Sequence, residues 1–189
     1  MSVVNLWQQW KDLMKFLKRL ARLIDSVNEF VGNLIAWVTL LMVLVVFVDV
    51  VMRYALNISF VFTQELEWHL FSAVFLLGAG YTLLHDGHVR VDIIYQAVSD
   101  KARAWINLIG VIFFLIPGCY LIIYTSYNFT YESWSTLEGS GDPGGIPYRF
   151  LIKSAIPIGF GLLLIQGFSL GIKSFLILCG QSLEEGEEV

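Results

Sequence analysis

Residues 31–48 read VGNLIAWVTLLMVLVVFV, eighteen consecutive positions without a charged side chain. Three more uncharged runs follow at 70–84, 104–125 and 154–172, with 15, 22 and 19 residues. A helix needs about 20 apolar residues to cross the roughly 30 Å hydrocarbon layer of a membrane. The second run comes near that length if it begins at Leu66, with Glu67 and His69 at the interface. The four runs predict an all-α integral membrane protein with four transmembrane helices.

The composition supports a membrane protein and excludes three other classes. Hydrophobic residues make up 57% of the 189 residues and charged residues 15%, against about 45–50% and about 25% in soluble domains. This apolar share does not suit a soluble enzyme, a nucleic-acid-binding protein or a disordered chain. The net charge is −4, and four acidic residues fall in the last six positions. We predict a membrane domain over 31–178 and an acidic, solvated tail over 179–189.

The first 30 residues carry a different pattern, with two faces. Apolar residues from Leu6 to Val27 recur at steps of four and three, which places them on one side of a helix. Basic residues recur with the same spacing on another side. We predict an amphipathic helix over 1–30 that lies in the membrane interface and binds phospholipid; a short coiled-coil seam is the alternative. The residues that carry this prediction are Trp10, Lys11, Lys15, Lys18 and Arg22.

The distribution of basic residues predicts the orientation. Of the 12 Lys and Arg residues, only Arg53, Arg149 and Lys153 lie in or beside the segments that follow the first and third runs. The others lie near the two termini or between the second and third runs. Because the side richer in Lys and Arg faces the cytoplasm, we expect both termini to be cytoplasmic.

The four runs contain no group that suits catalysis or ion transport. Intramembrane charges normally mark ion paths and proton relays, so their absence predicts that this chain is not the conduit of a transporter. We expect no enzyme activity, cofactor or metal site. Cys119 and Cys179 have no metal-ligand spacing. His69 and His85 stand about 24 Å apart along a helix, too far to bind one haem. The alternative function is that of a membrane anchor for a redox enzyme.

Polar residues at the ends of the runs suggest local pairing. Asp49 and Arg53 are four positions apart, so they share a helix face and are expected to pair. Glu65 and His69 have the same spacing.

Glycines and prolines inside the runs suggest how the helices pack and bend. Pro117 is expected to kink the third helix, and Pro157 is expected to lie in the first turn of the fourth. The small residues are expected to join helices closely; they are Gly78, Gly80, Gly110, Gly118 and Gly161.

Four short motifs occur in order between residues 30 and 175. They are DVVMRY at 49–54; QEL at 64–66 with FLLGA at 75–79; HVRVD at 88–92; and GGIPYRF at 144–150 with IPIGF at 156–160. Together they resemble the small membrane subunit, or DctQ family, of tripartite ATP-independent periplasmic (TRAP) transporters. The matching residues, which the resemblance assigns to subunit contact or structure, are Asp49, Arg53, Glu65, Gly78, His88, Asp92, Gly145, Pro147, Arg149, Lys153, Pro157 and Gly159.

The resemblance implies a function that composition alone does not give. Family members work in the bacterial inner membrane beside a large multi-span subunit (DctM-type). That subunit carries the substrate and ion sites, usually for sodium, and moves as an elevator. A periplasmic substrate-binding protein (DctP-type) delivers the substrate, typically an organic acid. The small subunit is expected to enlarge the stationary scaffold and to anchor it in lipid.

Overall fold

The computed structural model describes residues 3–87 and 98–181, and its secondary structure in these ranges is entirely helical. The first helix, α1, is 53 residues long and covers Val3–Ala55. It is followed by α2 (Val61–Leu77) and α3 (Ala79–Leu84). After the undescribed residues come α5 (Asp100–Gly110), a π-helical turn η1 (Val111–Leu115) and α6 (Ile116–Ser135). The last helix, α7, covers Phe150–Leu178.

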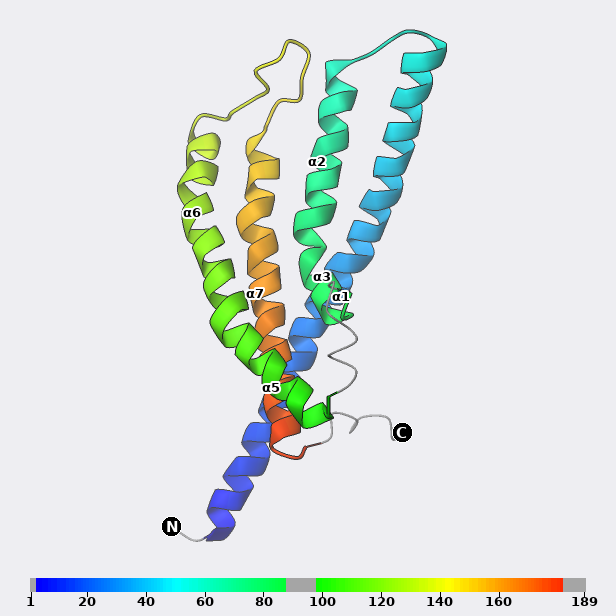
Figure 1. The fold of residues 1–189 in the computed structure, drawn as a ribbon. Coiled ribbons are helices and arrows are strands. Elements are labelled where there is room, and N and C mark those ends of the chain that lie inside the picture. Colours follow the sequence, from blue (N-terminus) through cyan, green and yellow to red (C-terminus); the bar gives the residue numbers. More distant parts are fainter. Residues whose placement is uncertain (1–2, 88–97, 182–189) are drawn as a thin grey trace.

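The helices run between two ends of an elongated bundle (Figure 1). At one end, here called the loop end, residues 56–60 join α1 to α2 and residues 136–149 join α6 to α7. Toward the other, the terminal end, α3 ends first, α5 begins and α7 ends farther along, and α1 begins beyond them. The central element is α7, because it packs against α1, α2, α3, α5, η1 and α6.

Three helical stretches are long and apolar enough to cross a membrane: Trp7–Ala55, Asp100–Ser135 and Phe150–Leu178. The fourth predicted span is not confirmed by this criterion, because α2 has only 17 residues. Gly78 separates α2 from α3, although its N–H still bonds to the Val74 carbonyl oxygen at 3.0 Å. The backbone therefore stays close to helical where α2 passes into α3.

The separate amphipathic helix predicted over 1–30 is not confirmed, since α1 passes through residue 30 without a break. Its buried inward side chains include Met14, Ala21, Asn28 and Asp49, all at multiples of seven residues from one another. The predicted apolar stripe is only partly exposed: Trp10 and Leu13 are 45% and 46% exposed, whereas Ile24 is 9% exposed and faces the protein. The N-terminal part of α1 therefore has one face against the protein and a neighbouring apolar edge that the described residues leave exposed.

Glycines allow two close helix crossings. A β-carbon at Gly159 on α7 would lie 2.4 Å from the Leu76 carbonyl oxygen on α2. A β-carbon at Gly80 on α3 would lie 2.1 Å from Oδ1 of Asn28 on α1. The expected close packing is therefore present at Gly80. No atom outside the local backbone lies within 4 Å of such a β-carbon at Gly110, Gly118 or Gly161.

The two prolines lie in different surroundings. Pro117 follows the η1 turn, in which the Ile116 N–H bonds to the Val111 carbonyl oxygen five residues back. This wider turn accommodates a residue that has no N–H, and the α5–α6 column bends there (Figure 1). The prediction for Pro157 is wrong: α7 begins at Phe150, so Pro157 lies inside the helix. The Lys153 carbonyl oxygen, which Pro157 leaves without a helical donor, accepts a bond from Thr130 Oγ1 at 3.4 Å.

Candidate functional site

The Glu65 carboxylate on α2 forms the main polar contact at the loop end. Its side chain is 7% exposed, and it accepts hydrogen bonds from Ser140 Oγ at 2.5 Å and from the Ile146 N–H at 2.6 Å. The Arg149 guanidinium lies 4.0 Å away. We call these four residues the loop-end brace. It fastens α2 to the loop that leads into α7.

The loop sequence explains why these donors meet one carboxylate. The Ser140 N–H bonds to the Ile146 carbonyl oxygen at 3.0 Å, which closes the loop on itself. Gly144 adopts a positive φ of 82°, a conformation that glycine tolerates best. A β-carbon at Gly145 would lie 2.6 Å from Glu65 Oε2, so the approach of the carboxylate requires glycine there. Pro147 follows Ile146 directly and fixes φ at the exit of the loop.

Two basic residues of the family motif, one in the brace and one beside it, make further contacts. The Arg149 guanidinium lies 5.5 Å from the centre of the Trp68 ring. The Lys153 ammonium bonds to Glu138 at 2.5 Å and lies 4.0 Å from the centre of the Phe129 ring. The hydrogen bond from Lys153 holds the pKa of the Glu138 carboxyl below its usual value, since it stabilises the charged form. This pair joins the loop to the first turns of α7.

The predicted pair of Asp49 and Arg53 is confirmed. The Arg53 guanidinium donates to the Asp49 carboxylate one turn away on α1. Thr63 Oγ1 on α2 also donates to Asp49, at 2.9 Å. Asp49 is 1% exposed while the Arg53 side chain is 45% exposed. Asp49 therefore links α1 to α2, and the outer face of Arg53 is accessible.

The other residues named from the sequence lie at separate places. His69, four positions after Glu65, contacts its backbone: Nδ1 lies 2.6 Å from the Glu65 carbonyl oxygen. Gly78 interrupts the α2–α3 column, and Gly159 and Pro157 lie within α7 as described above. His88 and Asp92 lie outside the described residues.

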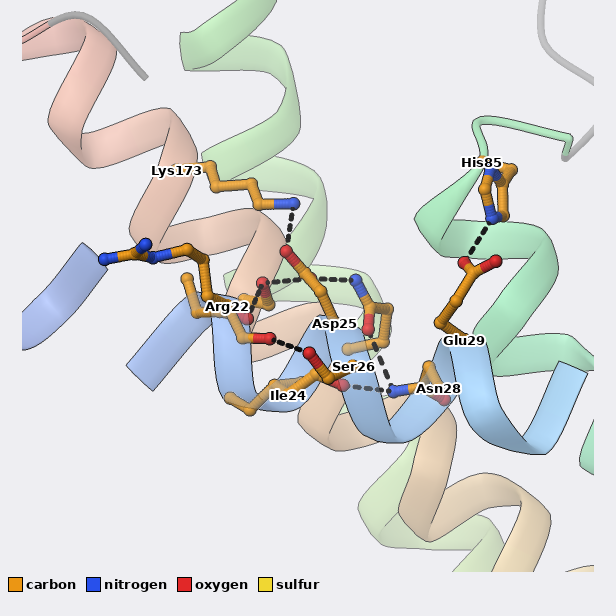
Figure 2. A network of polar contacts seen from close by, with 11 residues as sticks. Arg22, Ile24, Asp25, Ser26, Asn28, Glu29, His85 and Lys173 are labelled. Atoms are coloured by element: carbon orange, nitrogen blue, oxygen red, sulfur yellow. Dashed lines mark hydrogen bonds and ion pairs between the residues drawn. The ribbon is translucent and has the colours of Figure 1, made fainter. Parts of the chain in front are cut away.

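A second polar cluster, which the sequence did not predict, joins α1 to α7 at the terminal end (Figure 2). The Asp25 carboxylate accepts hydrogen bonds from Gln166 Nε2 at 2.9 Å and from Ser169 Oγ at 2.7 Å, and the Lys173 ammonium lies 2.7 Å away. Asn28 Nδ2 donates to Gln166 Oε1 at 2.9 Å. We call these five residues the terminal-end network.

The signal for this network was present in the sequence. Gln166, Ser169 and Lys173 recur at steps of three and four, so they share one face of a helix. Asp25 and Asn28 are three positions apart on α1. Nearby, His85 Nε2 lies 2.7 Å from the Glu29 carboxylate and links the end of α3 to α1 (Figure 2). Gln166 and Ser169 lie within the uncharged run at 154–172, whereas Asp25, Asn28 and Lys173 lie outside the runs, so the runs alone do not connect them.

The residues predicted for the interfacial helix line a groove instead of a flat surface. Trp10, Lys11, Lys15, Lys18 and Arg22 all border it, together with Met14, Arg19 and Gln181. Its volume is about 500 Å³. Contact of these residues with a membrane surface remains a prediction.

Taken together, the polar groups of both clusters join helices to one another and to the α6–α7 loop. Each carboxylate described above has a donor within the chain. Within residues 3–87 and 98–181, no group of three or more His, Cys, Asp and Glu side chains is placed to hold a metal ion.

Comparison with known proteins gives one consistent family. The family described as "Tripartite ATP-independent periplasmic transporters, DctQ component" matches residues 42–173. The C4-dicarboxylate TRAP transporter small permease protein DctQ of Vibrio cholerae is 26% identical, covering 86% of this chain and 74% of the relative. The ectoine TRAP transporter small permease protein TeaB of Halomonas elongata is 27% identical, covering 78% and 75%. No solved structure matches. These relatives give no support to the redox-anchor alternative.

The loop-end brace can be tested by replacing Glu65 with Gln. A carboxamide retains one acceptor oxygen and introduces donors, so Ser140 Oγ and the Ile146 N–H can no longer both be satisfied. We expect the thermal midpoint of unfolding of the detergent-solubilised chain to fall by about 3 °C or more. Glu132→Gln, on the exposed surface of α6, is the matched control and should change the midpoint by less than about 1 °C. Equal midpoints for the two variants would show that the brace contributes nothing to the thermal stability of the chain.

Proposed function

Because this chain belongs to the DctQ family of TRAP transporters, in which its relatives are small permease subunits, we propose that it is the stationary scaffold beside a large DctM-type subunit. The large subunit would carry the substrate and ion sites, and a DctP-type periplasmic protein would deliver the substrate. The supporting observation is the placement of polar groups. The loop-end brace lies just before α7 and the terminal-end network lies in the second half of α7, from Gln166 to Lys173; α7 carries no charged side chain between Lys153 and Lys173. A solute path would need polar groups near the membrane midplane.

We propose four membrane passes for this scaffold. The three long apolar helices supply three passes. The fourth would be α2 with α3, which together run from the loop end toward the terminal end and stop short of the end of α7 (Figure 1). The uncharged stretch of this pair, residues 70–84, is shorter than a full span, so the membrane would thin locally or the polar ends would reach the interface.

The outward faces of the helices provide the surface for lipid and for the large subunit. On the middle of α1, Trp37 and Phe47 are 72% and 65% exposed. On the other side of α7, Phe114 of η1 and Tyr124 of α6 are 75% and 69% exposed. In water these side chains would favour aggregation, whereas a membrane and a large apolar partner would cover them.

We further propose that the transporter is driven by an ion gradient, usually sodium, and carries an organic acid. The family resemblance supports this, as does the relative whose name specifies C4-dicarboxylates. The ectoine transporter relative shows that family members differ in substrate. The chain would reside in the bacterial inner membrane.

Reconstitution tests the scaffold proposal. Liposomes containing this chain alone, with a sodium gradient and a loaded periplasmic binding protein, should take up no more substrate than empty liposomes. Uptake should appear when the large subunit is added, because that subunit supplies the polar path. Gradient-driven uptake by this chain alone would refute the scaffold role.

The proposed orientation places the loop end in the periplasm and the terminal end in the cytoplasm, in agreement with the Lys and Arg distribution. Cysteine labelling checks this in a chain whose Cys119 and Cys179 are replaced by Ala. Gly141→Cys suits the test, because nothing lies within 4 Å of its β-carbon position. It should react with an impermeant thiol reagent from the periplasm. Lys101→Cys, at the start of α5, should react only after the cytoplasmic side is opened. The reverse pattern would invert the topology.

A further inference from the structure

The basic groove at the terminal end has a composition that suits one class of ligand. Five cations border it within three turns of α1: Lys11, Lys15, Lys18, Arg19 and Arg22. No carboxylate of the described residues borders it. The groove has a volume of about 500 Å³, enough for a group larger than a simple ion. We propose that this groove is a binding site for the phosphodiester headgroup of an anionic phospholipid.

Charge complementarity supports an anionic ligand. The five cations are spread over about 16 Å of helix α1. A phosphodiester in the groove therefore has positive charges beside it at every position along the groove. Lysine supplies a compact ammonium, and arginine supplies a planar fork that donates to two phosphate oxygens at once. Lys11 is partly oriented already, since its ammonium lies 3.8 Å from the centre of the Trp7 ring.

The apolar part of the groove favours a lipid over a free phosphate. Trp10 lines it beside the cations and is 45% exposed. Trp7, whose ring lies against the Lys11 ammonium, is 62% exposed. A free phosphate would satisfy the cations and leave these side chains in water. A phospholipid places its phosphate on the basic residues and its glycerol and acyl groups on the apolar ones.

The chain itself contains a competing anion. Gln181 borders the groove, and Glu184, Glu185, Glu187 and Glu188 follow a few residues later. A glutamate segment would neutralise the cations, but its only apolar side chains are Leu183 and Val189, which offer less apolar surface to Trp10 than the acyl chains of a lipid. We therefore assign the groove to lipid. The assignment rests on the proposed cytoplasmic location of the terminal end, where the headgroups of the inner leaflet are within reach.

Lipid titration of the full chain in neutral-detergent micelles tests the assignment. Retained dioleoyl-phosphatidylglycerol is counted by native mass spectrometry, with dioleoyl-phosphatidylcholine as the neutral comparison. We expect retention of phosphatidylglycerol alone. The double variant Lys11→Gln/Lys15→Gln should weaken its binding about 30-fold, from about fivefold for each lysine near a phosphate.

A matched variant separates the groove from general charge effects. Lys101→Gln/Arg103→Gln removes the same charge at the terminal end, away from the groove, and should alter binding by less than about threefold. A chain ending at Gln181 should bind with unchanged affinity. Equal losses in the two double variants would overturn the proposal, as would equal retention of both lipids.

A more than tenfold gain in lipid affinity on removing residues 182–189 would assign the groove to the tail. Displacement of the lipid by millimolar glycerol phosphate would assign it to a free anion. None of these results bears on transport, so the scaffold proposal stands or falls separately.

Discussion

The position of α7 against α1 depends on the contacts of the Asp25 carboxylate. Gln166, Ser169 and Lys173 all converge on it from consecutive turns of α7. A carboxylate at the edge of an apolar bundle is costly unless it is paired and hydrogen-bonded. Only one rotation and one axial position of α7 bring all three partners to Asp25. Apolar packing would tolerate neighbouring registers, whereas this network does not.

The loop-end brace imposes a second constraint on the same helix. Glu65 on α2 binds the loop immediately before α7, and Lys153 in the first turns of α7 binds Glu138 in that loop. With α7 held at these two places, its glycines meet α2 and η1 closely, as Gly159 does at the Leu76 carbonyl oxygen and Gly167 at the Leu115 side chain. The stretch of α7 between Lys153 and Lys173 then needs no charged side chain. Such a rigid body suits a subunit whose proposed role is to remain still while its partner moves.

Sequence patterns predicted the helical class, the apolar runs and the Asp49–Arg53 pair because these depend on composition and on spacing within one helix. The contacts of Glu65 with Ser140 and Ile146 were not predictable, since they join residues more than 70 positions apart. The start of α7 was placed too late because the apolar run begins after Lys153, a polar residue that the helix nonetheless includes. The continuity of α1 was missed because basic residues and membrane-spanning residues follow one another on a single helix.

A double-mutant cycle between Asp25 and Lys173 tests this account most directly. Asp25→Asn, Lys173→Gln and the double variant would be unfolded reversibly in mixed micelles, and their free energies of unfolding compared with that of the original chain. If the pair holds α7 in position, the two substitutions should show a coupling in the free energy of unfolding of about 1 kcal/mol or more. This lies within the range found for residues of one polar network. Effects that add to within about 0.3 kcal/mol would show that the two side chains act independently, and would contradict the dependence of α7 on Asp25.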